Sequence, residues 1–306
     1  MSNRTKGMLC LVVSAFGFAA MGMFIRLTDD LGGPVSCFQK GFFRNLVAVA
    51  IAAALFFPRS SRAGGDRVSE PSNTERPRTS GHRRRHFPFS VFSILMLRSV
   101  LGTAGIFLNF YAISRIPLAD AMMLNKLAPF FTVAFSWLFL RERLRIGQAA
   151  CLAGALLGAA FVVKPGFAAA AFFPAMCGFV GGICAGGAYA CVHALGRRKV
   201  DGRLIVLFFS VFSCLASVPF MAVDHAPMTA AQVWALVGAG AAAALGQFGV
   251  TAAYRFAEPR SIAAWDYTNI LFAAVFGLVL FGQVPDAFSF AGFVVIVFSA
   301  LMLRRV

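Results

Sequence analysis

Charged residues are scarce in this chain. Only 13% of its 306 residues are Asp, Glu, Lys or Arg, while 59% are hydrophobic. A typical soluble domain has about 25% charged and about 45–50% apolar residues. This composition excludes a soluble globular protein and indicates an integral membrane protein. The apolar runs are continuous and about twice as long as the strand of a transmembrane barrel, so a barrel is excluded as well.

Acidic residues, histidines and disulfide-forming cysteines are few as well. The chain has 12 Asp and Glu against 28 Lys and Arg, with 4 His and 7 Cys. An odd number of cysteines in or beside apolar runs does not form a disulfide framework. The seven-residue spacing of Cys177, Cys184 and Cys191 favours one packed helix face over a metal or redox site. We therefore expect no metal and no cofactor.

Catalytic motifs are also lacking. A membrane enzyme that modifies lipids would need a cluster of acids, histidines or serines near one interface. The sequence offers only Asp29 and Asp30 in a predicted outer turn, the isolated His193 and His225, and two histidines, His82 and His86, in the long polar loop. It contains no metal-ligand spacing and no nucleophile elbow. We expect the protein not to be an enzyme, and a lipid-modifying membrane enzyme stands as the alternative class.

Apolar runs of membrane-spanning length are what the sequence has in quantity. About 20 apolar residues cross a bilayer as a helix, and ten runs qualify. They cover roughly residues 7–27, 34–57, 88–113, 118–139, 147–164, 172–195, 204–221, 231–254, 261–281 and 287–303. The first run is too long for an ordinary signal peptide and lacks a small-residue cleavage site. The predicted fold is an all-α integral membrane protein with ten transmembrane helices.

Basic residues gather in alternate loops. The richer set comprises Arg59, Arg62, Arg67, Arg76, Arg78, Arg83, Arg84, Arg85, Arg141, Arg143, Arg145, Arg197, Arg198, Lys199, Arg203, Arg255, Arg260, Arg304 and Arg305. The opposite loops hold only Arg26, Arg115 and Lys164 near the spans. This positive-inside pattern predicts that both termini are cytoplasmic, in the cell (inner) membrane. It also accounts for the net charge of +16 without nucleic-acid binding, which we do not expect.

The segment 58–87 is the only long polar stretch. It is rich in Arg, Ser, Pro and Gly and has almost no large apolar side chains before Phe87. Such a composition predicts a disordered cytoplasmic loop, and its arginines suit contact with anionic lipid headgroups. Membrane lipid is therefore an expected partner.

An internal repeat relates the two halves of the chain. The segment YRFAEPRSIAAWDYTNILFAAVFGLVLFGQVP follows the order of YAISRIPLADAMMLNKLAPFFTVAFSWLFLRERL about 142 residues earlier. Tyr254 falls near Tyr111, and Pro259 falls opposite Pro117. An odd number of spans in each repeat makes the copies run in opposite directions through the bilayer. We expect two inverted five-helix repeats, over residues 1–165 and 170–306.

These motifs carry a family resemblance that covers nearly the whole chain apart from the 58–87 loop. Phe110–Ala112, the Pro117 turn, Pro129 in the following span, Glu142 at its exit and Arg44 in the second span match the pattern of one group of proteins. The chain resembles the drug/metabolite transporter superfamily, specifically its EamA-type ten-helix members. The resemblance implies a secondary transporter that works by alternating access.

The resemblance leaves the cargo open and has one departure. Gln283 stands where the family usually places Glu in the second half. The superfamily moves amino acids, nucleotide derivatives, vitamins, sugar phosphates and drugs, so the resemblance does not define a substrate. Export of amphipathic drugs is the alternative to transport of a small polar metabolite.

Four basic residues lie inside predicted spans, namely Lys40, Arg44, Arg98 and Lys126. Facing lipid, they would together cost about 10–14 kcal/mol on insertion scales, so they must face a wet or partnered interior. For Lys40 and Lys126, snorkelling toward an interface is the alternative. Arg44 and Arg98 lie nearer mid-depth, where snorkelling helps less.

Acidic partners for these cations are few. Asp120 stands at the start of the fourth span and Asp266 about six residues into the ninth. Four cations against two acids leave a positive interior, which favours a substrate with a carboxylate or phosphate held by arginine forks. Lys126 and Asp266 lie in corresponding spans, and we expect them to approach one central cavity from opposite halves. There they either pair with each other or trade partners between states.

Neutral polar residues complete the candidate substrate-binding site. Together with Lys40, Arg44, Arg98, Lys126 and Asp266, it comprises Asn109, Tyr111, Asn125, Gln247, Tyr254 and Asn269. Each of the neutral residues is as well suited to joining helices as to touching a ligand.

Small residues predict close helix packing. Gly178, Gly182 and Gly186 recur every four residues in the sixth span, as Gly154 and Gly158 do in the fifth. Such ridges bring helices together. We expect them to pack within the bundle, with a homodimer seam as the alternative.

Overall fold

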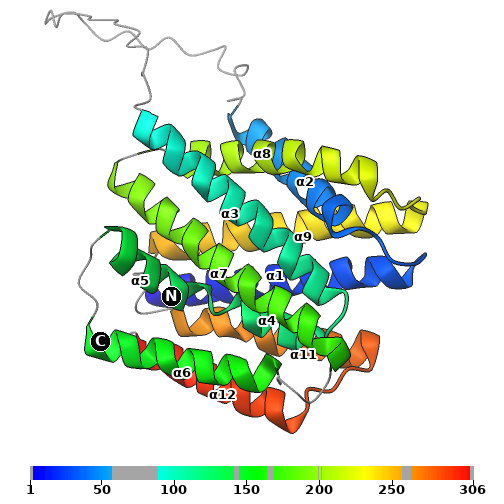
Figure 1. The fold of residues 1–306 in the computed structure, drawn as a ribbon. Helices are drawn as coiled ribbons and strands as arrows, with labels where there is room; N and C mark the ends of the chain where they lie inside the picture. Colours follow the sequence, from blue (N-terminus) through cyan, green and yellow to red (C-terminus); the bar gives the residue numbers. More distant parts are fainter. Residues whose placement is uncertain are drawn as a thin grey trace, which may run out of the picture.

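The computed structural model describes residues 3–56, 89–140, 145–163, 169–198, 200, 202–256 and 263–303. Its elements are α1 (Asn3–Asp30), α2 (Cys37–Phe56), α3 (Phe89–Ile113), α4 (Leu118–Asn125), α5 (Ala128–Leu140), α6 (Ile146–Val163), α7 (Ala169–Arg197), α8 (Gly202–Val223), α9 (Ala230–Phe256), the 3₁₀ helix η1 (Ala263–Tyr267), α11 (Thr268–Phe281) and α12 (Ala287–Leu303). Over these ranges the chain is helical and contains no strand (Figure 1). The predicted 58–87 loop and Glu142 lie outside the described residues.

The ten predicted spans correspond to ten helical segments, with α4 and α5 forming one span and η1 and α11 another. Seven segments are long and apolar enough to cross a membrane by themselves, and Trp265–Phe281 and Ala287–Leu303 are shorter apolar helices. The prediction of an all-α multi-pass membrane protein is confirmed.

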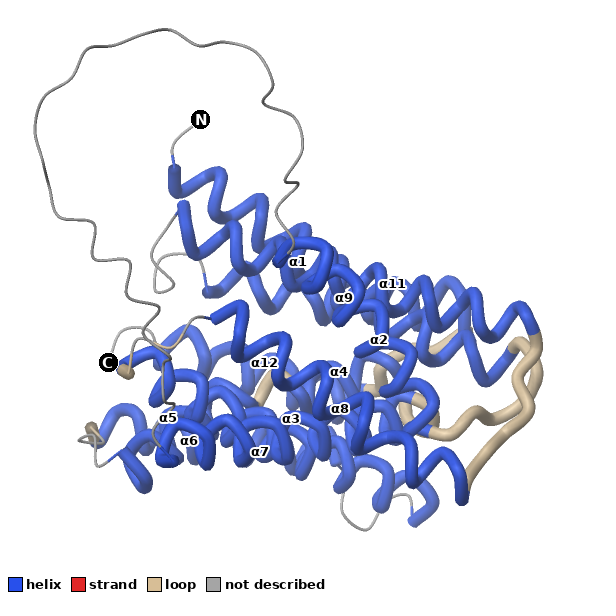
Figure 2. The backbone as a smooth tube through the Cα atoms, turned by 90° about the horizontal axis from the view of Figure 1, so that it is seen from above, coloured by secondary structure: helices blue, strands red, loops and turns tan. Residues whose placement is uncertain are grey.

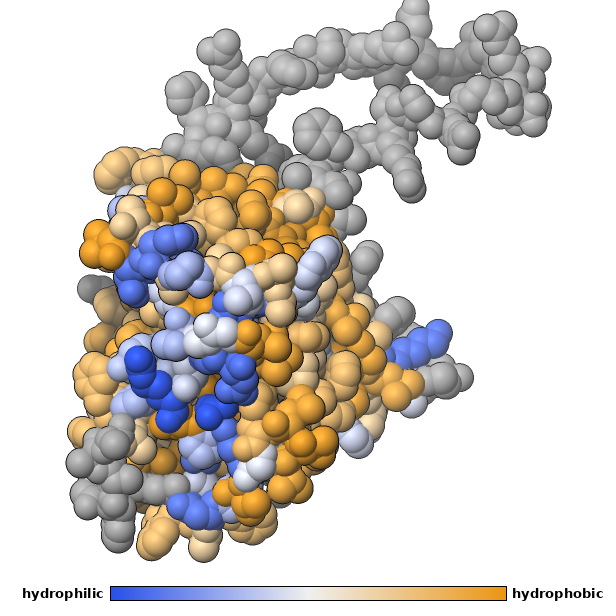
Figure 3. Space-filling view, turned by 90° about the vertical axis from the view of Figure 1, so that its right-hand side faces the viewer, coloured by the Kyte–Doolittle hydropathy of each residue, from blue (hydrophilic) through white to orange (hydrophobic). Residues whose placement is uncertain are grey.

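The helices place both termini at one end of the bundle (Figure 1), which we call the terminal end. The opposite end carries the turns at 31–36, 114–117, 224–229 and 282–286, and we call it the Asp29 end. Figure 3 looks at this end, where hydrophilic residues gather in the middle of the face and hydrophobic residues flank them. Side chains such as Phe139, Leu215 and Val279 are exposed on the bundle, as lipid contact requires.

The fourth span is broken at Lys126–Leu127. Pro129 has no N–H to bond to the carbonyl of Asn125, and its ring clashes with that carbonyl in a regular helix. The backbone therefore tightens to i→i+3 bonds, from Lys126 N–H to Met123 O at 3.0 Å and from Leu127 N–H to Leu124 O at 3.2 Å. The sequence predicted one continuous helix here, and the ninth span likewise begins as the short 3₁₀ helix η1.

Helices from the two halves pack directly on each other. α1 lies against α9 and α3 against α7, while α2 packs on α8 and α6 on α12. Figure 2 shows α1 and α9 together on one side of the molecule and α3 and α7 together on the other. Glycines permit this approach, since a Cβ at Gly17 would lie 2.6 Å from the backbone nitrogen of Gly246.

The predicted small-residue ridge of α7 is covered within the chain. A Cβ at Gly182 would lie 2.6 Å from the carbonyl oxygen of Leu124, and one at Gly186 would lie 2.8 Å from that of Ala128. Gly158 meets Ile296 of α12 in the same way. These ridges therefore join helices inside the bundle, as expected.

Candidate functional site

Lys126 and Asp266 form an ion pair between the two broken spans. The Lys126 Nζ lies 2.6 Å from Asp266 Oδ2, and the exposed fractions of the two side chains are 14% and 29%. This contact joins residues 140 positions apart. The expected pairing of Lys126 with Asp266 is confirmed, and snorkelling of Lys126 toward an interface is wrong.

The helix breaks explain why the pair forms at this point. Lys126 is the C-cap residue of α4, where a cation is favoured by the negative end of the helix dipole. Asp266 lies just before α11, where a carboxylate is favoured by the positive end. Each charge is thus stabilised by its own helix terminus as well as by its partner.

Arg44 on α2 and Arg98 on α3 are half-buried and incompletely bonded. Arg44 Nη1 donates to Asn45 Oδ1 at 3.1 Å. Arg98 lies over the ring of Phe209, with its Cζ 3.7 Å from the ring centroid. Arg44 Nε and both Nε and Nη1 of Arg98 have no hydrogen-bond partner in the part of the chain that the structure describes. Neither guanidinium has a carboxylate partner there.

Tyr189 on α7 links the arginines to the ion pair, and the sequence analysis did not select it. Its phenol interacts electrostatically with Arg44, Arg98 and Asp266. Its three partners come from three other elements, and its side chain is 55% exposed. The available signal was a single tyrosine in the Gly- and Ala-rich run GGICAGGAYA.

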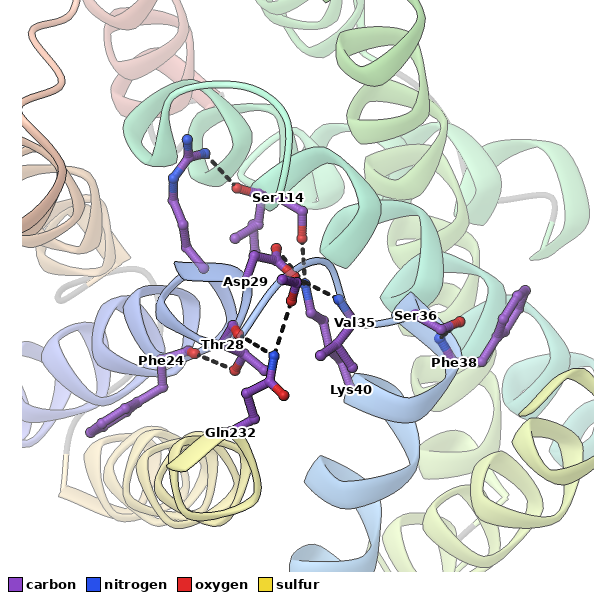
Figure 4. A network of polar contacts seen from close by, with 12 residues as sticks. Phe24, Thr28, Asp29, Val35, Ser36, Phe38, Lys40, Ser114 and Gln232 are labelled. Carbon is purple, nitrogen blue, oxygen red and sulfur yellow. Dashed lines mark hydrogen bonds and ion pairs between the residues drawn. The ribbon is translucent and has the colours of Figure 1, made fainter. Parts of the chain in front are cut away.

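Lys40 lies elsewhere, in a polar network at the Asp29 end (Figure 4). Its Nζ bonds to both carboxylate oxygens of Asp29 at 2.7 Å and to Ser114 Oγ at 2.6 Å. The Lys40 side chain is 1% exposed and that of Asp29 is 17% exposed. Snorkelling of Lys40 is wrong, and Asp29 is its counter-charge, which the sequence analysis had left in an outer turn without a partner.

Further hydrogen bonds close the same end of the bundle. Gln232 Nε2 donates to the carbonyl of Thr28 and to that of Gly33, each at 3.0 Å (Figure 4). Gln39 Nε2 donates to Ala226 O at 2.9 Å, and Ser36 Oγ donates to Asp224 Oδ2 at 2.7 Å. These bonds tie α1 and α2 to the ends of α8 and α9. The Asp29 end is therefore closed by polar contacts.

Two predicted site residues join helices. Asn269 is buried and donates from Nδ2 to the carbonyl of Ala15 at 2.8 Å. Tyr111 on α3 packs edge to face against Phe173 of α7, with the ring centroids 5.9 Å apart. Neither contact involves the Lys126–Asp266 pair.

The other predicted polar residues occupy varied positions. Asn109 is buried, and its Oδ1 has no hydrogen-bond partner among the described residues. Asn125 is half-buried at the end of α4, beside Lys126, and Gln247 on α9 is exposed. Tyr254 belongs to the last turns of α9, and its side chain lies outside the described residues.

Known proteins match this chain in sequence and in fold. The sequence profile of the EamA-like transporter family matches residues 5–164, which is more than half of the chain. The chain belongs to the EamA-like transporter family. A solved crystal structure with 18% sequence identity and a TM-score of 0.53, covering 95% of this chain and 96% of its own, shares the fold.

Curated relatives of the chain carry transporter names. It is 29% identical to the pseudopaline exporter CntI of Pseudomonas aeruginosa, over 98% of this chain and 96% of the exporter. It is 22% identical to the riboflavin transporter of Brucella anthropi, over 71% of this chain and 78% of the relative. It is 24% identical to the human solute carrier family 35 member G1, over 96% of this chain and 77% of the relative. The protein is a membrane transporter of a small molecule.

Proposed function

We propose that this transporter carries a small polar metabolite by alternating access. The metabolite bears a carboxylate or phosphate group, which Arg44 and Arg98 bind. The observation that carries the proposal is the set of unpaired guanidinium donors, Arg44 Nε and Arg98 Nε and Nη1. Buried charged donors without acceptors are costly. A planar guanidinium that is held in place matches the two oxygens of a carboxylate or phosphate.

The charge of the interior favours an anion over a cation. Lys126 is neutralised by Asp266, whereas Arg44 and Arg98 repel each other and have only neutral partners among the described residues, such as Asn45 and Phe209. An incoming anion would relieve this repulsion in an environment of low dielectric, where Coulomb interactions are strong. An amphipathic cation would increase it.

The helix packing supports a two-repeat mechanism. If α7, α8 and α9 correspond to α1, α2 and α3, then the α1–α9 contact is the counterpart of α3–α7. In the same correspondence α2 matches α8 and α6 matches α12, and each of these helices packs on its own counterpart. The profile match to residues 5–164 also ends where the first repeat would end. We propose repeats over 1–165 and 170–306 that rock against each other around the site.

The two ends suggest which gate is shut. Hydrogen bonds close the Asp29 end, whereas Tyr189, which interacts with Arg44, Arg98 and Asp266, is 55% exposed. We propose that the structure represents the form open toward the terminal end. From the arginine-rich loops we further propose that this end is cytoplasmic and that the membrane is the inner membrane.

Thiol labelling in intact cells tests the orientation. In a background without native cysteines, Ser72→Cys in the long loop should resist an impermeant reagent, and Asp30→Cys at the Asp29 end should react. Ser72 lies outside the described residues, so this test rests on the sequence alone. Rapid labelling of Ser72→Cys from outside would reverse the assignment.

Uptake by proteoliposomes tests the anion site. Labelled carboxylates, phosphate esters, zwitterions and amphipathic cations should be screened, and anionic compounds should accumulate. Arg44→Gln and Arg98→Gln should each weaken uptake by at least tenfold. Arg44→Lys and Arg98→Lys should retain only part of the wild-type uptake, because lysine keeps the charge but loses the planar guanidinium fork. Arg198→Gln, which removes an exposed charge bonded to Ser90, is the matched control. Normal uptake by well-folded Arg44→Gln and Arg98→Gln variants, or a cationic cargo, would refute the proposal.

A further inference from the structure

The Lys126–Asp266 pair is incompletely bonded. An ammonium has three N–H donors, and Lys126 uses one of them on a described residue, at 2.6 Å to Asp266 Oδ2. Lys40 uses all three, on Asp29 and Ser114. Asp266 is also 29% exposed. The Lys126 ammonium therefore has donors to offer a second anion while Asp266 is still bound.

Among the residues that the structure describes, no second cation is paired with Asp266. The titratable groups that interact with it are Lys126, Tyr189 of α7 and the adjacent Tyr267. η1 packs against α1, α11 and α12. The described lengths of α11 and α12 have no titratable side chain, and between Gly7 and Ile25 α1 has only Cys10. A carboxylate displaced from Lys126 would be left between two phenols.

We propose that Asp266 is the proton-binding site of this transporter: an anionic group of the substrate displaces the Asp266 carboxylate from Lys126, and the displaced carboxylate takes up one proton. This inference rests on the anion specificity proposed above. The step is an exchange of partners followed by protonation of the carboxylate to a carboxylic acid, and no covalent bond of the substrate changes.

Charge balance is the physical reason for this coupling. Arg44, Arg98, Lys126 and Asp266 together carry two net positive charges, and a bound monoanion with a protonated Asp266 leaves that sum unchanged. Without the proton, an unpaired carboxylate would be held in a partly desolvated site, which is unfavourable. A monoanion and a proton would therefore cross the membrane together, and the transport would be electroneutral.

A first experiment needs no substrate. Lys126→Met removes the ammonium and imitates its loss to a competing anion. Infrared spectroscopy of the full-length protein near neutral pH should then show the carbonyl band of a protonated carboxyl group, which should disappear in Lys126→Met/Asp266→Asn. Asp286→Asn, which alters the carboxylate that caps α12, is the matched control and should leave the band in place. A folded Lys126→Met protein without the band would overturn the proposal.

A second experiment uses the wild-type protein, so it does not depend on the folding of Lys126→Met. Benzoate and sulfate, which do not titrate near neutral pH, are added to purified protein in weak buffer with a pH-sensitive dye. We expect about one proton to be taken up per anion bound, and none in Asp266→Asn. Anion binding that requires Arg44 and Arg98 but takes up no proton would overturn this inference alone. Failure of both anions to bind, or binding that persists in Arg44→Gln and Arg98→Gln, would overturn the anion site as well.

Discussion

Two buried lysine–aspartate pairs in this molecule have the same chemistry and different environments. Lys40 is 1% exposed and bonds to both oxygens of Asp29 and to Ser114. Lys126 and Asp266 are 14% and 29% exposed and share a single described bond. The first pair has every ammonium donor satisfied, so nothing is left to bind an incoming group. The second pair is open to exchange, which is what a substrate site needs.

The difference arises from backbone position. Asp29 and Lys40 are 11 residues apart and flank the turn between α1 and α2, where Val35 N–H also donates to Asp29 Oδ1 at 3.0 Å. Lys126 and Asp266 come from helix breaks in separate spans, so relative movement of those spans changes their distance. The Lys40–Asp29 pair is therefore suited to holding the turn between α1 and α2 in place. The Lys126–Asp266 pair is suited to breaking and forming as the spans move.

Breaking the Lys40 pair should give the largest effect on stability. Asp29→Asn leaves a fully buried ammonium without its counter-ion, and removal of one member of a buried pair costs about 3–5 kcal/mol. We expect a loss of that size in the free energy of unfolding measured in detergent micelles. Lys40→Met/Asp29→Asn should recover at least half of the loss, because no unpaired buried charge remains.

The same change at the second pair is the matched comparison. Asp266→Asn should reduce the free energy of unfolding by about 1 kcal/mol or less, since partly exposed pairs contribute little. Equal losses from Asp29→Asn and Asp266→Asn would mean that the two pairs are equally structural, and the distinction drawn above would fail.

Much of the fold could be predicted from the sequence because bilayer thickness and hydropathy determine helix length and position. The Lys126–Asp266 pair was also predictable, since few acids are available in the spans and the repeat places the two residues in corresponding helices. Pro129 was recognised, but the break it causes at Lys126 was not. A proline inside a helix can kink it or break it, and the sequence alone does not decide between the two.

Other parts of the site required three dimensions. Asp29 looked like an outer-turn acid because α1 was expected to end near residue 27, whereas it extends to Asp30 and the turn folds Asp29 onto Lys40. Tyr189 could not be distinguished from a lipid-facing tyrosine until the fold brought Arg44, Arg98 and Asp266 close to it. Proximity between residues of four separate helical elements is a property of packing that no sequence pattern reports.

The smallest predicted effect concerns Gln283, the departure from the family pattern, at the Asp29 end. Its Oε1 accepts a hydrogen bond from the Leu118 N–H at 3.0 Å. Gln283, which lies just after the end of α11, therefore caps the N-terminus of α4. Gln283→Glu keeps an acceptor and adds a negative charge at a helix N-terminus, where such a charge contributes about 0.3–1 kcal/mol. Asp120 already lies in the first turn of α4, and its repulsion should hold the gain to the lower part of that range.

Salt dependence separates the two contributions of this cap. We expect Gln283→Glu to stabilise the protein slightly at low ionic strength and to match the wild type at high ionic strength, because salt screens the charge but leaves the hydrogen bond intact. Gln283→Ala, which loses the acceptor, should be destabilised by about 1 kcal/mol at any salt concentration. If Gln283→Ala unfolds like the wild type, the bond to Leu118 does not hold α4 and α11 together, and the closure of the Asp29 end rests on its other polar contacts, such as those of Lys40 and Gln232.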